Sequence, residues 1–471
     1  MFNLFLIGVL SFDTILNVPE LKCAHYGICI FDLSNDSLLY NYNGDKLFVP
    51  ASNMKIITTA TSLHFLGNQF QYKTRLYLKG QVKGNKLIGD IVIQGGGDPY
   101  FNLENLERLV NKIKTLNILE ITGGICVVDD YFTNERLPVG WSWHYLDAKY
   151  APEISALSFN KNVVSVRIRP TNDGDLANVY IYPATNYVKL MNRIKTSANG
   201  ENLIIYRKPE ENMIVVDGTI NIKNARDIDV AVKDPALFTG EYLKERIVSL
   251  GIKVSNPVKR ISSCDLFNQE SVPIVIDSVC SPVLFEIVKE TNTESENLYA
   301  EILLKTLGAE LYKEGSFSAG IRAIKEFLNI CGVDTCNISI WDGSGLSKHN
   351  LVSPLALISI LKYMYKSKLF EDFCRSLPEP GKGTLKGRFN GFTDTLQAKT
   401  GAIQASSCLS GYLKINGNFY AFSMLFNNFT CPTKKIAQIQ ERLIRAFIER
   451  MRNSNISNNP ELFYPAEVIK Q

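Results

Sequence analysis

Residues 71–257 have a different sequence pattern from both ends of the chain. Short strand-like runs dominate there, with Gly, Asn and Asp between them and one helix predicted over 234–250. Both ends instead combine strands with helices of clear apolar periodicity. Insertions are tolerated where chain ends lie close together. The pattern therefore indicates one α/β domain built from both ends of the chain, with a large β-rich insertion in the middle.

The length of 471 residues supports this division, because one hydrophobic core usually stops growing near ~250–300 residues. We expect one domain from residues 1–70 and 258–471, and an inserted region over 71–257. The insertion is expected to form two subdomains, about 71–160 with 235–257, and 161–234. The predicted strands are 24–32, 37–42, 74–82, 87–94, 163–169, 203–207, 213–222, 395–399, 405–415 and 419–427. The predicted helices at the two ends are 53–66, 282–290, 297–314, 318–331, 354–367 and 434–451.

The composition excludes several classes of protein. A content of 45% hydrophobic and 21% charged residues is that of a globular protein. The formal net charge of +4 does not support nucleic-acid binding. Four histidines, and ten cysteines without a C-x-x-C pair, argue against a metal centre. The apolar residues 1–12 are too few to span a membrane, and fit either an atypical secretion signal or a buried first helix.

Ser52 and Lys55 form an S-x-x-K at the predicted start of a helix. Residues three apart share one helix face, so the serine could be a nucleophile and the lysine its base. The motif alone is weak, because Ser158 and Ser359 begin further copies in this chain. Ser52 is the best candidate, since Pro50-Ala51 precede it and a strongly apolar helix follows.

Two further motifs come later in the chain. Ser295-Glu-Asn297 is an S-x-N whose hydroxyl and amide could face one cleft, although a helix cap explains Asn297 equally well. Lys399-Thr400-Gly401 ends a predicted strand, where it suits the binding of an anionic peptide end. A surface lysine entering a turn is the plain alternative. The order S-x-x-K, S-x-N, K-T-G is close to the set of penicillin-recognising serine acyl-transferases, and each motif has the expected context.

The chain also resembles a particular family, the D-alanyl-D-alanine carboxypeptidase/endopeptidases, which are class C low-mass penicillin-binding proteins of the penicillin-binding protein 4 type. The resemblance runs from about residue 26 to 448. The stretches that carry it are Val49-Pro-Ala-Ser-Asn-Met-Lys55, Gly89-Asp-Ile-Val-Ile-Gln-Gly-Gly-Gly-Asp-Pro99, Asp342-Gly-Ser-Gly-Leu-Ser347, Gly383-Thr-Leu-Lys-Gly-Arg388 and Ala398-Lys-Thr-Gly401. It implies a β-lactamase-like domain, an antiparallel sheet flanked by helices, interrupted between Ser52 and Ser295 by an inserted β-rich region.

The resemblance implies hydrolysis of peptidoglycan stem peptides through an acyl-enzyme on Ser52. Lys55 would accept the proton of Ser52, and Ser295 with Lys399 would protonate the leaving amine. Asn297 would hold the substrate amide. The backbone N–H groups of Ser52 and Ala402 would form the oxyanion hole. The reaction would need no metal and no cofactor, and β-lactams would act as inhibitors.

Four substrate-binding residues follow from the same resemblance. Thr400, Gly401 and Ala402 would line the substrate, but relatives usually carry Ser or Thr where Ala402 stands. Loss of that hydroxyl would weaken carboxypeptidase activity more than endopeptidase activity. Asp147 stands near the position of an acidic residue that, in relatives, binds the side-chain amine of the stem peptide; a solvated aspartate is the alternative.

Two other functions are compatible with these motifs. One is a β-lactamase-like hydrolase, and the other is a catalytically weakened module that binds wall peptides or penicillin. We expect location in the periplasm or cell envelope, with at most peripheral association with the envelope and no nucleic-acid partner. The sequence leaves open the oligomeric state, the third stem-peptide residue and the role of the insertion, which could shape the cleft, anchor the enzyme to the wall or bind partners.

Overall fold

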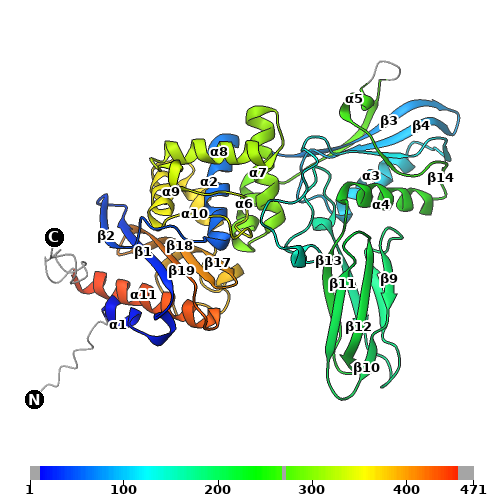
Figure 1. Cartoon of the computed structure of the whole chain (residues 1–471). Coiled ribbons are helices and arrows are strands. Elements are labelled where there is room, and N and C mark those ends of the chain that lie inside the picture. The colour runs from blue at the N-terminus through cyan, green and yellow to red at the C-terminus, as the bar shows by residue number, and fades with distance from the viewer. Residues whose placement is uncertain (1–10, 268–271, 455–471) are drawn as a thin grey trace, which may run out of the picture. The chain divides into compact units, whose positions relative to one another are not determined.

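The computed structural model describes residues 11–267 and 272–454, which form two packed units. The first unit comprises the described residues of Met1–Gln69, Leu284–Glu296 and Ile321–Gln471. The second comprises those of Phe70–Val283 and Asn297–Gly320. Figure 1 shows the elements of both. Among the described residues, no helix has the length and apolar character needed to cross a membrane.

The first unit is built around an antiparallel five-stranded sheet. In spatial order its strands are β17 (Thr395–Ile403), β18 (Ser406–Ile415), β19 (Asn418–Asn427), β1 (His25–Asp32) and β2 (Ser37–Tyr42). Both ends of the chain therefore contribute to one sheet, because β1 pairs with β19. β17 lies at an edge of this sheet, since β18 is its only strand neighbour among the described residues.

Helices cover both faces of this sheet. The helices of the first unit are α1 (Phe12–Leu16), α2 (Met54–Leu66), α6 (Leu284–Thr293), α9 (Pro354–Lys366), α10 (Phe370–Ser376) and α11 (Thr433–Ser454). Apolar side chains of α11 pack with those of β18, β19 and β1 in one core, which also contains Ile15 and Leu16 of α1. Figure 1 shows α1 lying beside α11. α9 contacts β19 and β1, and α2 contacts α9 and α6. The chain passes between the units within α8 (Phe317–Ile330).

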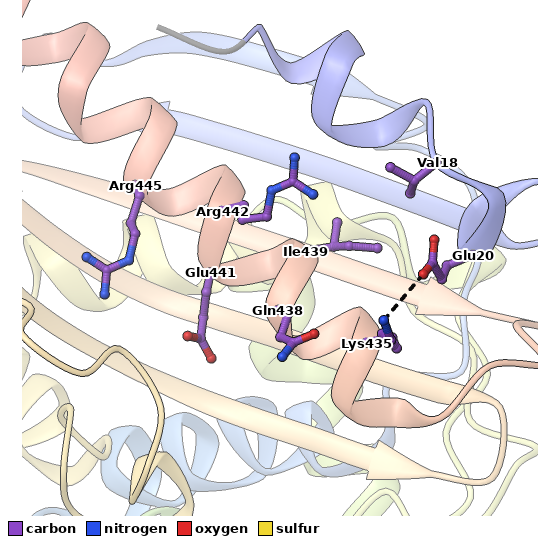
Figure 2. A pocket seen from close by; sticks show the side chains of 8 residues that line it. All are labelled: Val18, Glu20, Lys435, Gln438, Ile439, Glu441, Arg442 and Arg445. Carbon is purple, nitrogen blue, oxygen red and sulfur yellow. Dashed lines mark ion pairs between the residues drawn. The ribbon is translucent and has the colours of Figure 1, made fainter. Parts of the chain in front are cut away.

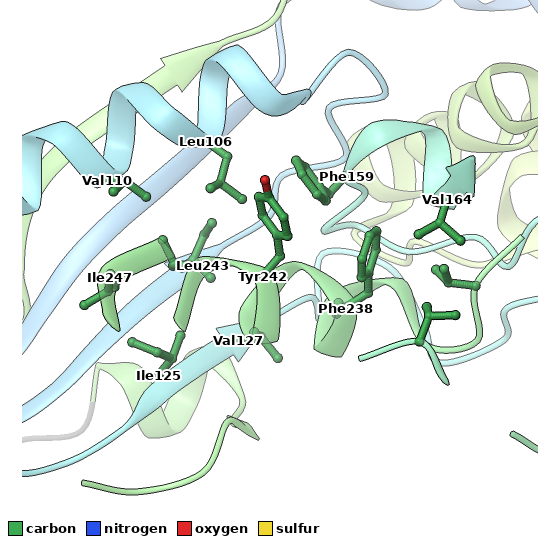
Figure 3. Packing of buried hydrophobic residues seen from close by; sticks show 14 of the residues in the cluster. Leu106, Val110, Ile125, Val127, Phe159, Val164, Phe238, Tyr242, Leu243 and Ile247 are labelled. Atoms are coloured by element: carbon green, nitrogen blue, oxygen red, sulfur yellow. The ribbon is translucent and has the colours of Figure 1, made fainter. Parts of the chain in front are cut away.

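The second unit contains a mixed seven-stranded sheet with helices. Its strands are β3 (Lys73–Lys83), β4 (Lys86–Gln94), β5 (Glu120–Ile121), β6 (Ile125–Val128), β14 (Lys253–Val254), β15 (Lys259–Arg260) and β16 (Ile274–Cys280). Its helices are α3 (Leu103–Lys114), α4 (Pro235–Ser249), α5 (Ser263–Leu266) and α7 (Asn297–Tyr312). Figure 3 shows side chains of α3 and α4 packed with those of β6 in a shared core.

Two small sheets complete the second unit. One has the order β13 (Arg226–Ala231), β7 (Val163–Arg169), β8 (Asn178–Tyr182), and the other has β10 (Lys195–Ser197), β12 (Met213–Asn221), β11 (Asn202–Arg207), with β9 (Lys189–Asn192) paired to β12. Their inner apolar side chains, such as Val166 and Val216, are fully buried in the same core cluster as α3 and α4. The two sheets thus form a small β-sandwich.

Most predicted elements are confirmed, but some were missed. The predicted hairpin 24–32/37–42 and the helices near 53–66, 234–250 and 354–367 appear within a few residues of their expected bounds. The expectation of one helix in the middle region is wrong, because α3 is a second one. α3 has a strong apolar stripe, with Leu106, Leu109, Val110 and Ile113 buried, and a capping box at Asn102. That signal was in the sequence.

The predicted division into domains stays a prediction. Two segments that it assigned to the penicillin-binding domain pack within the second unit, namely 258–283 and 297–320. β16 pairs with β3, and Thr306 of α7 accepts a hydrogen bond from the Tyr72 hydroxyl at 3.0 Å. The first ten residues, on which the choice between a signal and a buried helix depends, lie outside the described residues.

Candidate active site

Ser52 and Lys55 lie one turn apart where a 3₁₀ turn, η2 (Ala51–Asn53), runs into α2. Lys55 Nζ is 3.0 Å from Ser52 Oγ. Lys55 is completely buried, whereas Ser52 is half-buried. Ala51 has a φ of 46°, a left-handed conformation that is costly for a residue with a Cβ. The turn thus presents a serine hydroxyl beside a buried amine at the start of an apolar helix.

A second element holds Lys55 from the other side. Lys55 Nζ donates a hydrogen bond to the Ser344 carbonyl at 2.8 Å. Ser344 belongs to the turn 342–347, which the buried carboxylate of Asp342 organises. This carboxylate accepts bonds from Gly345 N at 2.7 Å, Ser347 N at 2.6 Å and Asn350 Nδ2 at 2.7 Å. The sequence flagged the stretch 342–347 as typical of the family but gave it no role.

The turn fits closely against α2 and the residue that precedes Ser52. Gly345 has a φ of +84°, and a Cβ there would lie 1.8 Å from the Ala51 carbonyl oxygen. Thr58 Oγ1 donates to the Gly343 carbonyl at 2.7 Å. Only glycine permits this approach, so the turn and α2 are fixed relative to each other.

Lys399 and Ser295 form a second hydroxyl–amine pair in the same unit. Lys399 Nζ donates to Ser295 Oγ and to the Thr400 carbonyl, both at 3.0 Å. Side chains alternate along β17, so Lys399 points to the face opposite Leu396 and Ala398, which pack in the α11 core. Ser295 has a φ of 63° between α6 and α7, which turns its hydroxyl out of regular helix.

The electrostatics of Lys399 favour a neutral amine. Burial holds the pKa of Lys399 well below its usual value of 10.5, and the positive charge of Lys55 lowers it further, while Glu294 opposes the shift. A lysine with a lowered pKa can exchange protons near neutral pH, which a general acid or base needs.

β17 lies against η2, the turn that carries Ser52. Asn53 Nδ2 donates to the Lys399 carbonyl at 3.1 Å. A Cβ at Gly401 would lie 2.8 Å from the Pro50 carbonyl oxygen and 3.0 Å from Ser52 N, so the glycine allows this contact. Asn53 was missed in the sequence, because its contact with β17 joins residues more than three hundred positions apart.

Alternation along β17 also places the N–H of Ala402. The Ala398 N–H points away from β18, because it donates to the Pro378 carbonyl at 3.0 Å. Backbone groups of residues an even number apart leave an antiparallel strand on the same side. The N–H of Ala402 therefore leaves β17 at its open edge, as does that of half-buried Thr400. Ala402 itself is exposed.

Two further predicted site residues are Asn297 and Asp147. Both belong to the second unit, where each bonds to the backbone: Asn297 Nδ2 donates to the Tyr150 carbonyl at 2.8 Å, and Asp147 Oδ2 accepts from Arg207 N at 3.2 Å. Asn297 is the first residue of α7, two positions after Ser295.

The other S-x-x-K copies have structural roles. Ser158 is buried and donates to the Ser155 carbonyl, and Lys161 follows with a φ of 55°, so this pair is not on a helix. Ser359 and Lys362 do lie on α9, but Lys362 forms an ion pair with Asp36 at 2.6 Å. Tertiary structure thus separates the Ser52 motif from copies that the sequence could rank only by context.

A well-formed pocket elsewhere in the first unit contains none of these residues. It has a volume of about 390 Å³ and lies along α11, where Lys435 forms an ion pair with Glu20 at 3.8 Å (Figure 2). Its lining is Val18, Glu20, Lys435, Gln438, Ile439, Glu441, Arg442 and Arg445. Among the described residues, no group of three or more His, Cys, Asp or Glu could hold a metal ion.

A model of one protein family matches almost the whole chain. The match to the D-Ala-D-Ala carboxypeptidase 3 (S13) family covers residues 9–446. Among curated proteins, a D-alanyl-D-alanine carboxypeptidase of Actinomadura sp. (strain R39) is 29% identical over 444 residues, which is 90% of this chain and 82% of that protein.

Solved structures show the same fold. Penicillin binding protein 4 (dacB) from Haemophilus influenzae superposes with a TM-score of 0.81 at 22% identity, covering 93% of this chain and 99% of that one. The same protein complexed with a novel β-lactam gives a TM-score of 0.75 at 21% identity, with the same coverage. These likenesses confirm the predicted fold class, a β-lactamase-like domain with a large β-rich insertion.

Proposed function

The chain belongs to the D-Ala-D-Ala carboxypeptidase 3 (S13) family, and from this premise we propose that Ser52 is its acyl-enzyme nucleophile. It is a serine-type D-Ala-D-Ala carboxypeptidase and a penicillin-binding hydrolase. We take peptidoglycan stem peptides as its substrate and the cell envelope as its location. The observation that carries the proposal is the pair of hydroxyl–amine contacts, Ser52 with Lys55 and Ser295 with Lys399, each at 3.0 Å.

Acylation begins with attack of Ser52 Oγ on the carbonyl carbon of the penultimate D-alanine. Lys55 accepts the hydroxyl proton, which requires its amine to be neutral. The Ser344 carbonyl, 2.8 Å from Lys55 Nζ, binds an N–H of this amine and so directs its lone pair to Ser52. The backbone N–H groups of Ser52 and Ala402 stabilise the oxyanion.

The leaving amine then needs a proton. Ser295 gives its hydroxyl proton to this amine, and the proton that Lys55 accepted from Ser52 replaces it through Lys399, whose neutral amine can accept a proton and pass it on. The C–N bond breaks, D-alanine leaves, and the shortened stem peptide stays as an ester on Ser52. Water attacks the ester, which frees the serine. A β-lactam ring opened by Ser52 would leave a more persistent ester.

The open edge of β17 supports the same reaction. An extended peptide can add to an exposed strand edge through backbone hydrogen bonds. Thr400, Gly401 and Ala402 stand on the part of β17 that follows Lys399, and the alternation described above leaves the N–H groups of Thr400 and Ala402 free of β18. Asn297 and Asp147 enter the proposal as further substrate-binding side chains. Because Ala402 lacks a hydroxyl for a terminal carboxylate, we expect endopeptidase activity to be the better retained of the two.

The test is the intact mass of the protein after incubation with benzylpenicillin. Wild type should gain the mass of one penicillin, and Ser52→Ala should gain none, because the substitution removes the hydroxyl that forms the ester. Ser359→Ala is the matched control, since it removes the serine of another S-x-x-K on a helix, and it should be acylated like wild type.

The other functions give different results. Rapid consumption of benzylpenicillin without a lasting adduct would indicate the β-lactamase-like hydrolase. Neither adduct nor hydrolysis in folded wild type would indicate a catalytically weakened binding module. Release of D-alanine from a peptide ending in D-Ala-D-Ala, lost in Ser52→Ala, would identify the carboxypeptidase reaction directly.

A further inference from the structure

The small sheet β13-β7-β8 of the second unit has one face that is not part of the core. Alternation along β7 buries Val164, Val166 and Ile168 and turns Ser165, Arg167 and Arg169 outward. The strand register aligns these with outward residues of the two neighbours, in rows such as Asp227–Arg167–Tyr180. We call this surface the tyrosine face; it consists of Ser165, Arg167, Arg169, Asn178, Tyr180, Tyr182, Asp227 and Asp229.

Two large aromatic side chains stand exposed on the tyrosine face. Tyr180 is 46% and Tyr182 is 44% exposed. They are two residues apart on β8, so their rings project from the same side about 7 Å apart along the strand. A tyrosine ring combines apolar surface with a polar end, which suits a ligand that is itself both apolar and polar.

Arginines lie beside both rings. The Arg167 guanidinium is 3.9 Å from the centroid of the Tyr182 ring, and the Arg169 guanidinium is 5.9 Å from that of Tyr180. Arg167 Nε is buried and has no hydrogen-bond partner among the described residues. The face therefore presents planar guanidinium groups beside its rings.

The charges of the tyrosine face largely cancel. Arg169 forms an ion pair with Asp227 at 2.5 Å, and Lys149 approaches Asp229 at 3.8 Å. Paired charges do not attract a polyanion, so a nucleic acid or an acidic polymer does not fit this surface. Exposed rings flanked by hydrogen-bonding groups of balanced charge fit a neutral polymer of sugar rings.

We propose that the tyrosine face binds a neutral polysaccharide, the N-acetylated glycan strand of the cell wall, with sugar rings stacked on Tyr180 and Tyr182. This rests on the proposed function, because the stem peptides that the enzyme cleaves are side branches of such a strand. Binding the strand would keep the enzyme on the polymer between cleavage events. It gives the inserted sandwich the role of a wall anchor.

The test is co-sedimentation of the full-length protein with chitin, an insoluble, peptide-free and uncharged glycan of β-1,4-linked N-acetylglucosamine. Soluble β-1,4-linked N-acetylglucosamine oligomers serve as competitors. The variant Tyr180→Ala/Tyr182→Ala should lose about tenfold or more in affinity, as expected when two stacking rings are removed. Tyr180→Phe/Tyr182→Phe should retain most of the binding, because it keeps the rings.

Tyr206→Ala is the matched control. Tyr206 is also 44% exposed, but it lies on β11 in the other sheet of the sandwich, so its loss should leave glycan binding unchanged. Benzylpenicillin acylation, measured on every variant, reports the state of the Ser52 site separately. If wild type binds glycan but is not acylated, the proposed function is wrong, whereas the proposal that the tyrosine face binds glycan is retained.

Three outcomes would overturn the glycan proposal. In the first, the Tyr180→Ala/Tyr182→Ala variant sediments with peptide-free glycan as well as wild type does. In the second, Tyr206→Ala loses as much binding, which would mean that removing any exposed tyrosine weakens glycan binding. In the third, wild type binds only peptide-bearing wall, or binds single-stranded DNA more tightly than glycan.

Discussion

Lys399 is a completely buried lysine whose amine donates to the Ser295 hydroxyl and the Thr400 carbonyl, and its chemistry follows from that position. Burial removes the water that would solvate an ammonium group, and Lys55 adds a like charge. The amine therefore stays neutral at a pH where an exposed lysine is charged. The sequence places Lys399 on a strand, two residues before Gly401, but it does not show that the side chain is buried. The burial depends on the helices that cover the sheet.

We predict that the rate of benzylpenicillin acylation rises with pH along a limb whose midpoint lies well below 10.5. The sign follows from the lowered pKa of Lys399, since raising the pH through that pKa produces the neutral amine. Lys399→Arg should slow acylation by about 100-fold or more and abolish that limb, because a guanidinium stays charged. The measurement is acylation rate against pH by intact mass. An unchanged rate and profile in Lys399→Arg would contradict the prediction.

The serine motifs also show which contacts a sequence pattern can predict and which it cannot. Spacing alone predicted that Ser52 and Lys55 share one helix face, and they do. The same spacing at Ser158 did not give a helix, because the backbone turns left-handed at Lys161. Ser295 and Lys399 are brought together only by the sheet and helices between them, so the sequence could propose their contact only through the order of the motifs.

The turn 342–347 holds Lys55, the base of the proposed mechanism, in position. Asp342 ties its N–H groups together, and the Ser344 carbonyl then points to Lys55. Acceptance of several hydrogen bonds by one buried carboxylate gives a rigid turn, because each buried donor would otherwise lack a partner. A backbone carbonyl leaves no mark on a sequence pattern, which is why this contact was missed.

We predict that Asp342→Asn slows benzylpenicillin acylation by about tenfold or more and lowers the free energy of unfolding by about 1–3 kcal/mol. The substitution replaces one carboxylate oxygen by an NH₂ group, so one backbone N–H of the turn loses its acceptor. The turn then shifts, and the Ser344 carbonyl shifts with it. Acylation kinetics and urea unfolding measure the two effects.

Asp334→Asn is the control for this element. Asp334 also accepts a backbone hydrogen bond, from Cys336 N at 2.9 Å, but on an exposed turn. It should change neither quantity by more than experimental error. Equal effects of the two substitutions, or a wild-type acylation rate in Asp342→Asn, would show that the turn does not position Lys55.

At the scale of the whole molecule, the described residues contain separate cores in the two units. The core around α11 belongs to the first unit, and the core around α3 and α4 belongs to the second. Asp98, in the Gly-rich stretch 95–99, is buried in the second unit. Its Oδ1 accepts from Tyr100 N at 2.8 Å, and its Oδ2 has no partner among the described residues. Burial raises the pKa of Asp98 to about 7, against the opposing effect of the Tyr100 bond.

We predict that this carboxyl makes the stability of the protein depend on pH. The folded state holds the proton up to about pH 7, whereas the unfolded chain loses it near 3.8. Stability from this group is therefore complete below the lower value and is lost as the pH rises to about 7. Asp98→Asn, which is neutral at every pH, should be more stable than wild type at pH 8 by on the order of a few kcal/mol.

Urea unfolding at pH 5 and pH 8 measures the effect. The difference between Asp98→Asn and wild type should shrink at the lower pH. Asp175→Asn, at an exposed aspartate of the same unit, should show no such dependence. A variant that is less stable than wild type at pH 8 would mean that Asp98 is ionised in the folded protein.

The sequence by itself determined the fold class, the family and the local structure around Ser52. Helical and strand periodicity reports which side chains face a core, and motif order reports chemistry, so both can be found without coordinates. Tertiary structure decided which distant groups meet: Ser295 with Lys399, Lys55 with the Ser344 carbonyl, and the tyrosine face across three strands. These contacts depend on strand register and on backbone positions hundreds of residues apart. Neither leaves a periodic signal in the chain.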